Sequence, residues 1–207
     1  MKYKMTPRFD NVSQLKFLHG YKDLPHNDNR DRGIIRLNFD ESECLWRSVK
    51  ATTGRIFEIG RRHGGSTVLL AAAAGLEREV VSVDIDPKHH EVCQQFFDHK
   101  EFGKNIILYI ANSIKIVPGN LGLLFIDGDH SYVGCRRDIT THWRNLDIGG
   151  LCVFHDAVPN EGLRYSGDTM VLNHEPGVAV AAAELIVTGR AAAVDSAGSV
   201  LVLKKLK

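Results

Sequence analysis

Residues 57–67 read FEIGRRHGGST, and this stretch decides the fold. The apolar run that leads into it, RIFEIG at 55–60, is typical of a short buried strand that ends in glycine. Ser66 can then cap an apolar helix through TVLLAAAAG at 67–75. A buried strand, a glycine-rich turn and a helix in this order predict one β-α unit of a layered sheet.

The same alternation continues along the chain. Further apolar strands are expected at 80–86, 105–110, 121–127 and 151–156. Helices are expected at 40–51, with Asp40 near the cap, and at 87–99, 132–145 and 178–189. Residues 191–205 read as two strands joined by Ser-Ala-Gly. The predicted fold class is α/β, a doubly wound and mostly parallel sheet with helices on both faces and a C-terminal antiparallel edge hairpin.

Bulk properties indicate an ordinary globular chain of 207 residues, 43% hydrophobic and 25% charged. Residues 1–37 are polar and irregular, so we expect an N-terminal appendage or lid there and a single domain over 38–207. Twenty-six basic against twenty-five acidic residues give no electrostatic footprint for nucleic acid. The four cysteines lack the spacing of a zinc site or disulfide framework.

The longest apolar run, 68–74, is too short to cross a membrane, and MKYKMTPRFDNV at the N-terminus does not resemble a signal peptide. These features predict a cytoplasmic protein with a small-molecule partner and no membrane contact. The apolar segments AAAV and VLVL of the edge hairpin could support a homo-oligomer.

The residues that follow the first two strands favour a nucleoside-bearing ligand. In open parallel sheets, ligands bind beyond the carboxyl ends of the strands. Gly60 and Gly64 allow backbone to approach a ligand closely, and amides at a helix start can hold a carboxylate or phosphate. Asp84 ends the second strand, where an acid accepts hydrogen bonds from ribose hydroxyls in nucleotide-binding folds.

The dinucleotide fingerprint GxGxxG and the Walker A sequence are both absent. Instead, FEIGRRHGGST resembles the first motif of class I methyltransferases, which have a Rossmann-like fold. LLFIDGDHSYVGCRRDI at 123–139 and GGLCVFHD at 149–156 extend the resemblance to the macrocin-type O-methyltransferases and cephalosporin hydroxylase-like proteins, also called methyltransferase family 24. Residues 38–156 are also similar to the catechol and caffeoyl-CoA enzymes.

The resemblance implies S-adenosylmethionine as the cofactor. It assigns Glu58 and the backbone of Gly60 to Gly64 to the methionine part, with Ser66 near the carboxylate. It assigns Asp84 to the ribose, and Asn112 and Ser113 to the adenine.

The resemblance also implies a divalent cation such as Mg²⁺ held by Asp127 and Asp156. Asp127 is in addition expected to contact the cofactor and to take part in catalysis. His130 lies where the catechol and caffeoyl-CoA enzymes have a catalytic lysine, and its neutral imidazole could remove the acceptor's proton. The sequence departs from these relatives at His155-Asp156-Ala157, where they have Asp-Asn or Asp-Asp. Three alternatives stay open: His155 substitutes as a ligand and favours a transition metal, water completes the shell, or no metal is bound.

The predicted activity is S-adenosylmethionine-dependent O-methylation of a small molecule, with sugar, glycoside and phenolic acceptors all open. One rival is a metal-dependent hydroxylase or hydrolase on the same fold. A second is a cofactor-binding protein without catalysis. A third, an NAD-dependent oxidoreductase, is disfavoured because the dinucleotide fingerprint is absent.

Overall fold

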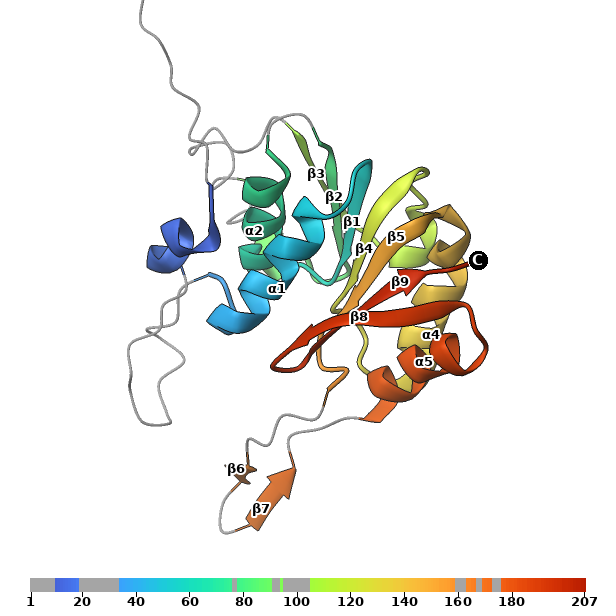
Figure 1. Cartoon of the computed structure of the whole chain (residues 1–207). Helices are drawn as coiled ribbons and strands as arrows, with labels where there is room; N and C mark the ends of the chain where they lie inside the picture. The colour runs from blue at the N-terminus through green and yellow to red at the C-terminus, as the bar shows by residue number, and fades with distance from the viewer. Residues whose placement is uncertain are drawn as a thin grey trace, which may run out of the picture.

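The computed structural model describes residues 10–18, 34–75, 78–90, 94, 105–158, 163–166, 169–172 and 176–207. Within these residues a seven-stranded sheet has the order β3-β2-β1-β4-β5-β9-β8 (Figure 1). The parallel strands are β1 (Arg55–Ile59), β2 (Val80–Asp84), β3 (Ile106–Ile110), β4 (Leu121–Ile126) and β5 (Leu146–Phe154). The antiparallel pair β8 (Ala191–Ala197) and β9 (Val200–Lys205) joins the sheet through β5. The predicted fold class, including the edge hairpin, is confirmed.

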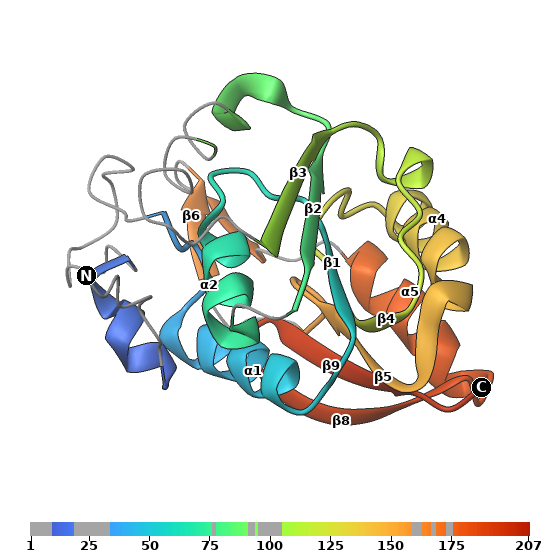
Figure 2. The ribbon, with the colours of Figure 1, turned by 90° about the horizontal axis from the view of Figure 1, so that it is seen from above.

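Helices cover both faces of the sheet (Figures 1 and 2). One face carries α1 (Phe39–Lys50) and α2 (Gly65–Ala74), and the other carries α4 (Tyr132–His142) and α5 (Pro176–Val187). Successive strand residues point to opposite faces. Ile56 and Phe125 therefore pack with α1 and α2, whereas Phe57 and Leu124 pack with α4 and α5. Because both faces are buried, the strands read as continuous apolar runs.

Shorter elements complete the described part of the chain. They are the 3₁₀ helices η1 (Val12–Leu18), η2 (Pro87–His89), η4 (Ser113–Lys115) and η5 (Trp143–Asn145), and a separate hairpin of β6 (Leu163–Ser166) and β7 (Thr169–Leu172). The helix predicted over 87–99 is described only at 87–90 and 94, where it begins as a 3₁₀ turn, and its remainder lies outside the described residues. Of the described helices, none is long and apolar enough to span a membrane.

The described parts of the N-terminal region pack against the core rather than standing apart from it. Val12 and Leu15 of η1 are buried in the same cluster as α1 and α2, and so are Ile35 and Leu37. The division of the chain at residue 37 and the lid role stay predictions. These described residues therefore pack on the side of the sheet that carries α1 and α2.

Two helices begin at other residues than the sequence pattern predicts. Asn38 is the N-cap of α1, in a capping box with Glu41, and Asp40 lies near the cap in the first turn. Helix α2 begins at Gly65, with Gly64 as its N-cap in the left-handed conformation (φ 82°). Ser66 therefore lies in the first turn of α2 and is not its cap. The reason is that the chain turns sharply on the glycines, a conformation that only glycine adopts readily.

Backbone hydrogen bonds align the carboxyl ends of the central strands. The Gly60 amide donates to Val83 O, Asp127 N to Ile59 O at 2.8 Å, and His155 N to Ile126 O at 3.1 Å. Gly60 has φ 90°, and a Cβ built on it would lie 2.0 Å from Asp127 O. The strand-end loops meet so closely that no side chain fits at residue 60.

We predict that Gly60→Ala lowers the free energy of unfolding by about 2 kcal/mol or more, because it adds both backbone strain and a steric clash. Urea unfolding followed by circular dichroism measures this change. Gly119→Ala is the matched control, since a Cβ there meets nothing within 4 Å. Equal stability of the two variants would contradict the close packing of Gly60 on Asp127.

Candidate active site

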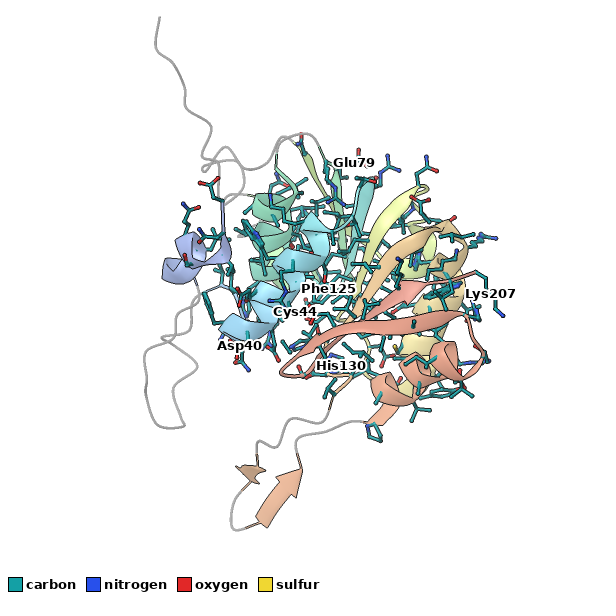
Figure 3. All side chains as sticks on the ribbon, viewed as in Figure 1. Asp40, Cys44, Glu79, Phe125, His130 and Lys207 are labelled. Carbon is teal, nitrogen blue, oxygen red and sulfur yellow. The ribbon has the colours of Figure 1, made fainter. Side chains whose placement is uncertain are left out.

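A cavity of about 860 Å³ lies beyond the carboxyl ends of the parallel strands. Figure 3 shows His130 at this end of the sheet, opposite Glu79, which precedes β2. The predicted site residues that line the cavity are Gly60, Ser66, Asp84, Asn112, Ser113, Asp127, His130, His155 and Asp156. The fold thus brings residues from five strand ends and one helix start to a single space.

Glu58 and Gly64 are not among the lining residues. The Glu58 side chain is fully buried in β1 and accepts a hydrogen bond from Thr67 in α2. Burial raises the pKa of Glu58. The alternation of the strand turns this side chain under α2. Its observed contact ties the first turn of α2 to β1. The assignment of Glu58 to the methionine part of the cofactor stays a prediction.

Asp84, at the end of β2, holds the loop that follows β1. One carboxylate oxygen accepts hydrogen bonds from the backbone amides of Arg61 (2.9 Å) and Arg62 (2.6 Å), and the other accepts from Asp86 N. A carboxylate offers about four acceptor positions. Asp84 can therefore organise this loop and still accept a hydrogen bond from a ligand in the cavity.

Asn112 and Ser113, after β3, reach the cavity together with a residue that the sequence pattern did not single out. Asn112 caps η4 by accepting from Ile114 N, and the Ser113 hydroxyl donates to Asp138 Oδ1 at 2.5 Å. Asp138 lies on α4, is 2% exposed and lines the cavity. Its position in the middle of a helix gave no local signal of a binding role.

Three side chains at the ends of β4 and β5 form a compact group of potential metal ligands: Asp127, His130 and Asp156. One ligand atom from each lies within 4.8 Å of the others. His130 Nε2 is 3.4 Å from Asp127 Oδ1, and His130 Nδ1 is 3.4 Å from Asp156 Oδ2. The hydrogen bond to Asp127 raises the pKa of His130. The predicted cluster of acids and imidazole therefore exists in the fold.

His155 contacts both carboxylates of this group. Its Nδ1 is 3.0 Å from Asp127 Oδ1 and 3.4 Å from Asp156 Oδ2, and its Nε2 faces Glu41 at 3.8 Å. Burial alone would lower the pKa of His155, but the surrounding carboxylates raise it to about 12. Burial alone would raise the pKa of Asp127. The positive charge of His155 opposes this effect, and the pKa of Asp127 is lowered. Both ring nitrogens of His155 face carboxylates, an arrangement that orients acids more readily than it binds a metal.

Glu41 is a further site component that local sequence patterns did not reveal. It is 3% exposed, and one oxygen accepts from Asn38 N at 2.7 Å. The other accepts from the Ser199 amide and hydroxyl, at 2.9 and 2.8 Å. The capping box at 38–41 was the only available signal, and it indicates a helix start. The link to His155 and Ser199 depends on how α1 meets the β8–β9 turn.

The backbone around Asp156 is held in an unusual conformation. Asp156 has φ 55°, in the left-handed region, where non-glycine residues are uncommon and often functional. The next two amides, of Ala157 and Val158, both donate to Ser199 O, at 2.9 and 3.0 Å. The β8–β9 turn therefore fixes the backbone that presents the Asp156 carboxylate to the cavity.

Comparison with known proteins places this geometry in a family. Residues 57–157 match a model of the family described as "Methyltransferase domain". They include the strand ends and the acid–histidine cluster of Asp127, His130 and Asp156. Residues 57–157 therefore belong to a methyltransferase family. The predicted family is confirmed. Over 79 residues the chain is 32% identical to catechol O-methyltransferase of Mycobacterium tuberculosis, a match that covers 36% of each protein.

Solved structures of methyltransferases share the fold over much more of the chain. An O-methyltransferase of tomaymycin synthesis from Streptomyces achromogenes, solved with S-adenosylmethionine (SAM), has a TM-score of 0.63 and 15% identity, covering 99% of this chain and 93% of that one. A methyltransferase from Podospora anserina, solved with S-adenosylhomocysteine (SAH), has a TM-score of 0.64 and 16% identity, covering 84% and 81%. At these identities the likeness establishes the fold.

We predict that in Glu41→Gln the free energy of unfolding falls less at acidic pH than it does in the wild type. Burial would raise the pKa of Glu41, but His155 and the amides of Ser199 and Asn38 lower it from 4.5 to about 2. The unfolded chain therefore binds more protons in this window, so the contribution of Glu41 is present above pH 4.5 and lost as pH falls toward 2.

The measurement is urea unfolding at pH 5 and pH 3. The wild-type free energy of unfolding should fall between these values, and Glu41→Gln should remove about 1 to 2 kcal/mol of that fall. Glu43→Gln is the matched control on α1, because the Glu43 side chain is 52% exposed and pairs only loosely with Arg47 at 3.8 Å. Parallel pH dependence in all three proteins would contradict the role of Glu41.

Proposed function

We propose that this chain transfers the methyl group of SAM to a hydroxyl oxygen of a small molecule. The observation that carries the proposal is that two kinds of residues line the same cavity. Gly60, Asp84 and Ser113 suit a nucleoside, and the group of Asp127, His130 and Asp156 suits an ionisable acceptor. Two of the solved methyltransferases hold SAM or SAH, and the curated relative acts on catechol oxygen, which supports the proposal.

The cofactor would lie across the ends of β1, β2 and β3. Asp84 retains acceptor capacity for the ribose hydroxyls, while the amides at the start of α2, near Ser66, suit the methionine carboxylate. Asn112 and Ser113 lie at the end of β3, where the base would sit. These assignments place the sulfonium near Asp127, toward the acid–histidine cluster.

In the transfer, the acceptor oxygen attacks the methyl carbon in line with the C–S bond. A C–O bond forms, the C–S bond breaks, and its electron pair stays on sulfur, which becomes a neutral thioether. The hydroxyl proton passes to His130, the base of the proposal. The main demand on the protein is alignment of the two substrates, which the rigid strand ends satisfy.

The described residues fit a divalent cation. Asp127 and Asp156 provide two carboxylates close to each other, whereas Ala157 offers no ligand. We assign the cation to the two carboxylates, with His155 orienting them. When bound, the cation would lower the pKa of the acceptor hydroxyl.

The acceptor is proposed to be small and not a nucleic acid. Two solved rRNA methylases also share the fold, with TM-scores of 0.56 and 0.54. The formal net charge of +1 lacks the strongly positive balance that is typical of proteins that bind the RNA backbone. Sugar, glycoside and phenolic hydroxyls all match the proposed chemistry.

Calorimetric titration tests the cofactor, and mass spectrometry of an acceptor panel tests the reaction. We expect binding of SAM and SAH, no binding of NAD or ATP, and a mass increase of one methyl group on a hydroxyl compound. Dialysis against a chelator should remove turnover, and Mg²⁺ or Mn²⁺ should restore it. Failure to bind SAM or SAH would refute the proposal, and methylation of rRNA alone would refute the small-molecule acceptor.

We predict that His130→Ala lowers kcat by about 100-fold or more, since general-base catalysis contributes on that scale. The dissociation constant for SAH should stay within about threefold of wild type, because His130 is assigned to the acceptor side. Steady-state kinetics and calorimetry on the same preparation provide both values. Near-normal turnover of His130→Ala would remove the residue from the mechanism.

A further inference from the structure

Asp138 is a buried acid in the wall of the cavity. It lies on α4 and is 2% exposed, yet it lines the cavity together with Asn112, Ser113 and Gly128. Burial raises the pKa of its carboxyl group. A carboxylate in such a place is costly unless both oxygens find donors.

Only one of the two oxygens is accounted for within the described chain. Oδ1 accepts the hydroxyl of Ser113. Oδ2 faces Gly128, at 3.7 Å from the position that a Cβ on this glycine would take. Among the described residues, no hydrogen bond reaches Oδ2. A ligand that enters the cavity can therefore satisfy it by presenting an N–H or O–H donor.

The surroundings of Asp138 indicate what kind of ligand group could donate a hydrogen bond to it. The neighbouring end of β3 provides Ala111 and Asn112, and the exposed side chain of Ile85 follows Asp84, which is assigned to the ribose. Apolar surface suits a flat heterocycle, and a fixed acceptor at its edge suits an exocyclic amine. At position 6, a 6-aminopurine presents an N–H donor. A 6-oxopurine presents an oxygen there, which a carboxylate repels, and carries its N–H donor on N1 instead.

We propose that Asp138, held in place by Ser113, accepts a hydrogen bond from the exocyclic amine of the cofactor's purine and so selects adenine over 6-oxopurines. This inference rests on the proposed function, since it concerns the same cofactor. It assigns the choice of base to α4, a helix that packs against η4 across the cavity wall.

The test compares SAH with S-inosylhomocysteine, whose purine has an oxo group in place of the amine at position 6 and a proton on N1. Calorimetry measures both dissociation constants for wild type, Asp138→Asn and Asp147→Asn. Asp147→Asn is the matched control, because Asp147 is an exposed aspartate on β5 outside the cavity lining.

Wild type and Asp147→Asn should bind SAH at least about tenfold more tightly than the inosyl analogue, the scale of a hydrogen bond to a charged group. In Asp138→Asn that ratio should fall to within about threefold, because an amide can accept from the amine or donate to the oxo group. A purely structural role would weaken both ligands equally and leave the ratio unchanged, which would overturn the inference.

If Asp138→Asn does not fold, the same ratio of dissociation constants is measured for Ser113→Ala. It keeps the carboxylate but removes the hydroxyl that orients it, so the preference for SAH should fall partway; an unchanged preference would contradict the proposal. Equal wild-type affinity for the two ligands would overturn this inference and leave the proposed function intact. If wild type binds neither ligand, both fail.

Discussion

The site depends on one constraint, the sharing of a single imidazole by carboxylates from three separate parts of the fold. His155 faces Asp127 and Asp156 with one nitrogen and Glu41 with the other. Acids this close would repel one another if nothing positive lay between them. His155 supplies that charge, and it follows β5 directly, so the sheet itself sets its position.

This constraint couples the catalytic end of the sheet to its periphery. Glu41 comes from the first turn of α1 and also binds the Ser199 turn between β8 and β9. The Ser199 carbonyl oxygen in that turn accepts hydrogen bonds from the two amides that follow Asp156. These hydrogen bonds hold Asp156 in its left-handed conformation. The edge hairpin is thus part of the support of the site, and the strain at Asp156 is offset by contacts far along the chain.

The cavity divides into two chemically distinct halves on the same row of strand ends. The half near β1, β2 and β3 offers acceptors and backbone amides, chiefly through Asp84 and the start of α2. The half near β4 and β5 offers the carboxylates and His130. Close packing of Gly60 on Asp127 joins the halves rigidly. Such a division suits a reaction whose main demand is alignment of two bound molecules.

The sequence by itself determined the fold class, the family and nine of the residues that line the cavity, because strand periodicity and strand-end residues are local patterns. It could not show that the Glu58 side chain turns toward α2, since the helix that covers a face of the sheet is decided by tertiary packing. It also missed Glu41 and Asp138, which stand on helices and read as ordinary capping or helical residues. Their roles come from contacts with Ser199, His155 and Ser113, distant in sequence. Only tertiary packing brings those groups together, and no local pattern records it.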